Sequence, residues 1–161
     1  MEPTALIEEL QLLPHPEGGF YRETWRCTLT LPGAVLPHGA DRSAATSIYF
    51  LLTADSFSAF HRIASDELWF FHAGDALEVI ALPARPDEEV DVWRLSAGSP
   101  FAVVPAGRTF GSRVVAGGRW SLVSCVVAPG FDFVDFVMPS RGELLAVHAA
   151  HGKLIGELTR G

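Results

Sequence analysis

The sequence predicts an all-β fold, an antiparallel sandwich or barrel with short helices at both ends. Three observations predict it. Short stretches rich in Val, Phe, Trp, Tyr and Ile recur along the chain, clusters of Gly, Pro, Asp or Ser separate them, and no helical periodicity interrupts them between Phe20 and Met138. Strands that follow one another without helices disfavour βαβ units and favour a sandwich or barrel.

Length and charge restrict the class of protein. The 161 residues fit one domain spanning residues 1–161, and 48% hydrophobic with 19% charged residues excludes disorder. Twelve basic and 19 acidic residues give a net charge of −7, which repels nucleic acids and anionic lipids. The opening MEPTALIEEL lacks the pattern of a signal peptide, and no apolar run reaches the ~20 residues of a membrane helix. We therefore expect a cytoplasmic protein that binds neither nucleic acid nor membrane.

The expected elements follow in chain order. Thr4 is expected to cap a short helix with Leu6, Ile7 and Leu10 on one face, which Pro14 prevents from continuing. The strand candidates are Phe20–Leu29, Ser43–Leu52, Ser56–Ile63, Glu67–His72, Ala76–Leu82, Val90–Leu95, Phe101–Val104, Arg113–Val115, Arg119–Val127 and Phe133–Met138.

The C-terminal end of the chain is expected to be helical. Ser140 and Glu143 have the spacing of a capping box, and Gly152 is expected to interrupt the helix that they begin.

One hairpin concentrates polar groups among aromatic residues. Two strand candidates meet at the turn Ala64–Asp66, and this hairpin can bring His61 and Glu67 together. A buried carboxylate beside an imidazole is suited to proton transfer, because burial and pairing move both pKa values toward neutrality. A salt-linked hairpin without chemistry is the alternative, which spacing alone favours. His72 alternates to the opposite face from Glu67.

This hairpin and the later stretch FAVVPAGRTF together resemble the paired motifs of the cupin superfamily. In the first motif the matching positions are His61, Ile63, Glu67 and Gly74. In the second motif they are Pro105, Gly107 and Phe110. The resemblance implies four metal-ligand positions, of which Ile63 and Phe110 offer only hydrocarbon. We therefore expect no bound metal and no other cofactor.

The flanking segments are similar to a small cupin-like family of single-domain proteins. They are HPEGGFYRETWR (15–26), RSAATSIYFLL (42–52), SDELW (65–69), VVPAG (103–107) and VAPGFDFVDF (127–136). The resemblance implies a double-stranded β-helix, the jelly roll of a cupin barrel, with a pocket inside. It also implies a homodimer, for which the aromatic strand Phe20–Trp25 is the candidate contact.

Departures from the family pattern bear on the ligand. Phe70, Phe101 and Phe110 stand where the family often has hydrogen-bonding side chains. The ligand is accordingly expected to be a small apolar or aromatic organic molecule, although drift in packing explains the exchanges equally well.

The Gly18-Gly19 pair marks a sharp entry into the first long strand. Tyr21 and Arg22 beside it, and Arg42 further on, either line the pocket mouth and bind an anionic group or form salt bridges at a strand edge. His15, between two prolines, is assigned to the turn itself.

The leading functional prediction is a metal-independent isomerase, epimerase or cyclase. In this interpretation His61 acts as general base or acid, Glu67 orients it, and Trp69 and Phe110 form pocket walls. A non-catalytic ligand-binding module is the alternative from another class. A metal-dependent cupin oxygenase ranks lower because two ligand positions are missing, and a purely structural protein ranks last.

Overall fold

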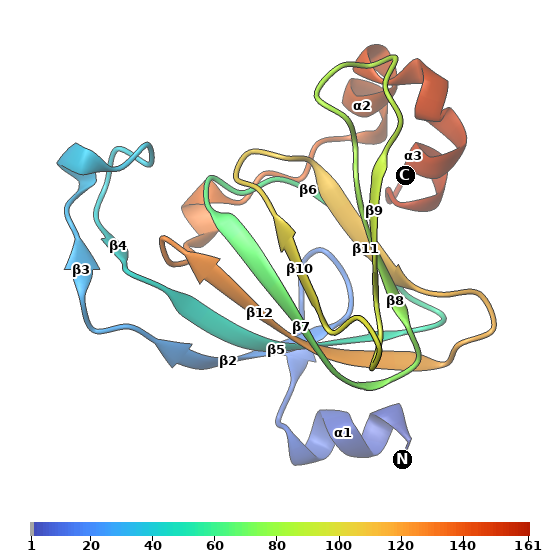
Figure 1. Ribbon diagram of the computed structural model, residues 1–161, viewed down its shortest axis with the longest axis horizontal. Coiled ribbons are helices and arrows are strands. Elements are labelled where there is room, and N and C mark those ends of the chain that lie inside the picture. Colours follow the sequence, from blue (N-terminus) through green and yellow to red (C-terminus); the bar gives the residue numbers. More distant parts are fainter. Residues whose placement is uncertain (1) are drawn as a thin grey trace.

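Two antiparallel β-sheets face each other in the computed structural model, which describes residues 2–161 (Figure 1). The large sheet has the order β1 (Leu13–Pro14), β2 (Phe20–Arg26), β5 (Thr46–Thr53), β12 (Trp120–Ala128), β7 (Asp66–Gly74) and β10 (Phe101–Val104). The small sheet has the order β6 (Ser58–His61), β11 (Phe110–Val114), β8 (Leu77–Ala81) and β9 (Asp91–Leu95). The predicted all-β architecture is confirmed.

A separate two-stranded arm leaves the body of the protein. It consists of β3 (Thr30–Leu31), the short 3-10 helix η1 (Gly33–Val35) and β4 (Arg42–Ser43), and it extends away from both sheets in Figure 1. This arm lies between the two strands expected at Phe20–Leu29 and Ser43–Leu52, and both strands are shorter than expected. The first of them ends at Arg26, and the second begins at Thr46.

The main core fills the space between the sheets, and strand alternation builds it. In β5, Ile48 and Phe50 face the small sheet, whereas Tyr49 and Leu51 face the other way toward α1 (Pro3–Glu9). Both faces of this strand are therefore covered, which explains why its sequence is apolar almost throughout. Leu6 of α1 packs against Leu51 on the outer face.

The C-terminal helices cover the small sheet. Leu144 of α2 (Arg141–Val147) and Ile155 of α3 (Gly152–Glu157) pack against Phe60 and Ile80, with η3 (Ala149–His151) joining the two helices. The expected capping box is present: the Ser140 hydroxyl accepts from the Glu143 amide at 3.3 Å, and the Glu143 carboxylate accepts from the Ser140 amide at 2.7 Å.

One expected helix cap and one expected strand were wrong. The first helix starts at Pro3 after Glu2, without a side-chain cap from Thr4, since proline at the first helical position already has a helical φ and needs no partner for an amide. The strand expected at Phe133–Met138 is instead η2 (Phe133–Asp135), begun by Asp132, whose side chain accepts from the Val134 amide. Val137 alone forms an isolated bridge, to Arg62. No helix in the described part of the chain is long and apolar enough to span a membrane.

Gly19 and Gly39 offer a matched test of close packing at the entry to β2. Both have a positive φ, +71° and +67°, but a Cβ at Gly19 would lie 2.7 Å from the Leu51 carbonyl oxygen, whereas nothing lies within 4 Å at Gly39. We expect Gly39→Ala to cost about 1 kcal/mol of unfolding free energy. Gly19→Ala should cost roughly 2 kcal/mol more, because the backbone must also shift. Urea denaturation measures both, and equal losses would contradict the close approach.

Candidate functional site

A cavity of about 430 Å³ lies against the inner face of the large sheet. Side chains from β5, β12 and β7 form one wall, and the end of β6 forms another. The turn before β2 and the loop after β12 complete the lining. The lining is mostly apolar, and its polar side chains come from segments that are far apart in the sequence.

His61, the last residue of β6, is held tightly in this cavity. Its ring lies between Phe110 and Phe136, with centroid separations of 4.3 and 5.3 Å. Its Nδ1 atom is 2.8 Å from the carbonyl oxygen of Ala59, and because a carbonyl only accepts, Nδ1 carries a proton. The orientation and tautomer of the imidazole are thereby set by its own strand.

Glu17, not Glu67, is the carboxylate that contacts His61. The Nε2 atom of His61 lies 3.2 Å from Oε2 of Glu17, and both side chains are buried. Since Nδ1 is already protonated, this contact requires one further proton, carried either by Nε2 or by the carboxyl group. The Ser58 hydroxyl donates to the other oxygen of Glu17 at 2.8 Å. His61 and Glu17 therefore form a buried pair that shares this proton.

A turn rather than a strand places Glu17 inside the barrel. The turn spans His15 to Gly19, and Gly18 and Gly19 both have positive φ values. The Ala59 amide donates to the Glu17 carbonyl at 2.8 Å, and the Arg160 guanidinium donates to the same oxygen. Arg160, near the C-terminus, therefore helps to hold Glu17 in the cavity.

His15 also belongs to the cavity, although the sequence suggested only a role in the turn. Its Nδ1 accepts a hydrogen bond from the Glu17 amide at 3.2 Å, and its ring contacts Tyr21 edge-on at 4.5 Å. Burial lowers the pKa of His15, so the imidazole is neutral at neutral pH and Nε2 carries its proton.

Glu67 lies in the same cavity without a cationic partner in residues 2–161. It sits on β7 between β12 and β10, and the thiol of Cys125 on β12 lies near its carboxyl group. Burial, reinforced by the negative charge of Glu17, raises the pKa of Glu67 to about 8. Glu67 is therefore mainly a neutral carboxylic acid at pH 7, able to donate a proton.

The other residues expected in the site are divided. Tyr21 lines the cavity. Trp69 and Phe110, expected as walls, are each 1% exposed and belong to the core behind it, so they support His61 and Phe50 instead. Trp69 shares a face of β7 with Glu67 but lies two residues further along the strand, where it joins Phe110 in the main core between the sheets.

Anion binding was one of two interpretations of Arg22 and Arg42, and the guanidinium groups of both contact other side chains. Arg22 borders the cavity, but its guanidinium lies 5.8 Å from the centroid of Tyr49, whose ring faces the outer side of the sheet. Arg42 forms a bidentate ion pair with Asp135: Nε donates to Oδ2 at 2.7 Å, and Nη2 donates to Oδ1 at 2.6 Å. That pair anchors the loop after β12, and of the two interpretations of Arg42 the structural one is supported.

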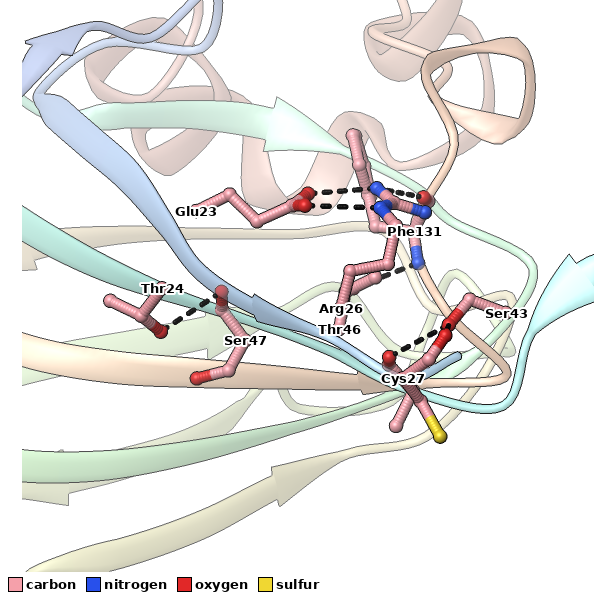
Figure 2. A network of polar contacts seen from close by, with 9 residues as sticks. Glu23, Thr24, Arg26, Cys27, Ser43, Thr46, Ser47 and Phe131 are labelled. Atoms are coloured by element: carbon pink, nitrogen blue, oxygen red, sulfur yellow. Dashed lines mark hydrogen bonds and ion pairs between the residues drawn. The ribbon is translucent and has the colours of Figure 1, made fainter. Parts of the chain in front are cut away.

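A polar network at the cavity mouth was not expected from the sequence (Figure 2). Glu23 and Arg26 pair through contacts of 3.0 and 2.7 Å, and Arg26 also donates to the Phe131 carbonyl at 3.3 Å. The Phe131 amide donates to the hydroxyl of Thr46 at 2.9 Å. A bulge between Glu23 and Trp25 brings Arg26 to the cavity side, and such a bulge leaves no readable sequence signal.

The cupin metal positions do not fit a metal here. Ile63 presents hydrocarbon to the cavity, and Phe110 is buried against the ring of His61. Both nitrogens of His61 are engaged, one by Ala59 and the other by Glu17. In residues 2–161 no group of three or more His, Cys, Asp or Glu side chains is placed to hold an ion.

Comparison with known proteins agrees with the fold and the motifs. The family model described as Cupin superfamily (DUF985) matches residues 4–139. An uncharacterized protein of Saccharomyces cerevisiae is 30% identical over 146 residues, covering 81% of this chain and 71% of its own.

Two solved structures are similar over nearly their whole length. A protein from Shewanella oneidensis shares 38% identity with a TM-score of 0.86, covering 99% of this chain and 98% of its own. A hypothetical protein from Leishmania major shares 35% identity with a TM-score of 0.91, covering all of both chains. The chain belongs to the DUF985 family of the cupin superfamily.

Proposed function

We propose that the cavity binds a small, largely apolar or aromatic organic molecule and moves a proton on it without a metal. The reaction class is an isomerisation, epimerisation or cyclisation. One observation carries the proposal. The buried His61–Glu17 pair opens into the same apolar cavity as the carboxyl group of Glu67, which has no cationic partner in the described residues. Groups whose environments separate their proton affinities are suited to act as an acid and a base.

The two polar groups support complementary roles. Glu67 donates its proton to a carbonyl oxygen of the ligand while the His61–Glu17 pair accepts a proton from the adjacent carbon, which gives an enol. Return of the proton to the same carbon, or to the γ-carbon where a conjugated double bond makes the enol a dienol, regenerates the carbonyl as the enol proton goes back to Glu67, and restores both groups. Every proton is conserved, so the scheme requires no oxidant, reductant or metal.

A binding module without catalysis is the second candidate, and one observation favours it. Both ring nitrogens of His61 are already engaged by the protein, which leaves only the carboxyl oxygens of Glu17 to receive a proton from a ligand. Deuterium incorporation from heavy water into a bound carbonyl ligand separates the two candidates, because only the proton-transferring protein exchanges the hydrogen next to the carbonyl.

The protein is further proposed to act as a homodimer. Beyond Tyr21, β2 has no neighbour from β1, so the stretch from Glu23 to Arg26 is an open sheet edge. Trp25 is 53% exposed on this edge, and Leu29 and Val35 of the adjoining arm are 62% and 74% exposed. A second copy would cover these side chains and the open edge together.

Native mass spectrometry of the freshly purified protein tests three parts of the proposal at once. We expect twice the subunit mass, a retained organic molecule, and no stoichiometric transition metal, because only two cupin ligand positions carry donor groups. One equivalent of metal that disappears in a His61→Ala variant would contradict the metal-free site. A monomer at micromolar concentration would contradict the dimer.

Glu67 should make stability depend on pH in a predictable direction. The unfolded chain releases this proton near the ordinary pKa of 4.5 and the folded protein near 8, so between these values the folded state holds more protons. Stability contributed by neutral Glu67 is therefore complete below about pH 4.5 and is lost as the pH rises toward 8, by at most about 1.4 kcal/mol per unit.

Glu67→Gln removes this dependence while preserving shape. Relative to the wild type, the variant should gain stability steadily from about pH 5 to pH 8, with no further change above that range. Urea denaturation at a series of pH values measures the difference, with Glu9→Gln on the exposed face of α1 as the control. Parallel pH curves for wild type and Glu67→Gln would show that Glu67 is ionised normally.

A further inference from the structure

The cationic groups around the cavity are all engaged or turned away, which restricts the charge of a ligand. Arg26 at the mouth is held by two bonds to Glu23 and one to the Phe131 carbonyl. The guanidinium of Arg22 lies over Tyr49. Arg42 is bonded to Asp135 and to the carbonyl of Asp41. In the described part of the chain, the cavity offers no free cation to an anionic ligand.

The acidic groups of the cavity interior are also paired or neutral. Glu17 is paired with His61 and accepts a hydrogen bond from Ser58. Glu67 is buried, and no cationic side chain of residues 2–161 pairs with it. Asp132 at the mouth uses one oxygen to accept from the Val134 amide. A cationic ligand in the interior would meet a carboxylate already paired with His61 and an acid that resists ionisation.

The walls provide no substitute for a counter-ion. Ile48, Phe50, Ile63 and Val127 form the inner surface, and Phe131 and Phe133 lie toward the mouth. A charge brought into such surroundings loses its hydration without gaining a partner, which costs far more than burying a hydrogen-bonded neutral group. The interior therefore selects against either sign of charge.

We propose that the ligand is uncharged where it enters the cavity, an aromatic or other apolar ring carrying a carbonyl oxygen that accepts a hydrogen bond from Glu67. This inference rests on the proposed binding function and narrows it. Of the two interpretations of Arg22 and Arg42, it disfavours the one in which they bind an anionic group. The volume of about 430 Å³ falls within the ~300–1,000 Å³ of small-molecule pockets and accommodates such a ring system.

A series of three naphthalene derivatives with nearly the same shape tests this proposal on the full-length wild-type protein. The probes are methyl naphthyl ketone, naphthoate and naphthylmethylammonium, which are neutral, negative and positive at about pH 7. Methyl resonances of Ile48, Ile63 and Val127 in carbon-13 NMR spectra report entry into the cavity. The ketone should bind about tenfold or more tightly than either charged probe.

Two variants of Glu67 test the hydrogen bond to the carbonyl. Glu67→Gln keeps a donor at this position, whereas Glu67→Met has a similar length and no donor. Ketone affinity should persist in Glu67→Gln and fall about fivefold or more in Glu67→Met, the effect of losing one hydrogen bond. Equal affinity in both variants would remove Glu67 from the recognition of the ligand and overturn its assigned part.

The outcomes separate this inference from the function on which it rests. If naphthoate or naphthylmethylammonium binds as tightly as the ketone or more tightly, the preference for a neutral ligand is overturned while a small-molecule site remains. If none of the three probes shifts the cavity methyls, both the neutral-ligand inference and the proposed binding function are contradicted.

Discussion

The contact between Glu17 and His61 is the constraint on which the site depends. It joins a turn near the N-terminus to the end of β6, and it brings a carboxylate into a space otherwise bounded by sheets and rings. Burying a carboxylate is costly unless it is paired and hydrogen-bonded, and Glu17 has both His61 and Ser58. Much of the surrounding structure, from the two glycines of the turn to Arg160, holds that carboxylate in place.

This pairing explains the behaviour of the second acid. Burial makes Glu67 costly to ionise. Because His61 is occupied by Glu17, Glu67 has no cationic partner among residues 2–161, and the nearby charge of Glu17 adds to this cost. Two carboxyl groups in one cavity therefore differ in role: one is paired with an imidazole, and the other keeps its proton to a higher pH. A mainly neutral interior follows, together with the preference for an uncharged ligand.

The sequence was sufficient for the fold and insufficient for the partner of His61. Strand alternation, turn residues and the capping box of Ser140 are local signals, and the elements built on them are largely where expected. The partner of His61 depends on how a turn crosses the barrel, which involves residues 44 positions apart (61 − 17). Hairpin spacing favours Glu67 because it relates only residues that are neighbours across one hairpin. The segment after β12 has the aromatic composition of a strand, which explains the wrong expectation. Its conformation as a loop with a short 3-10 helix depends on the distant contact between Arg42 and Asp135.

The most direct test is nitrogen-15 NMR of the His61 ring in the wild type, in Glu17→Gln and in Glu67→Gln. If Glu17 is the partner, Glu17→Gln shifts the Nε2 resonance strongly, whereas Nδ1 stays protonated because its bond to the Ala59 carbonyl is retained. Glu67→Gln should leave both nitrogens nearly unchanged. A shift of Nε2 that follows Glu67 instead of Glu17 would contradict the pairing and the division of roles derived from it.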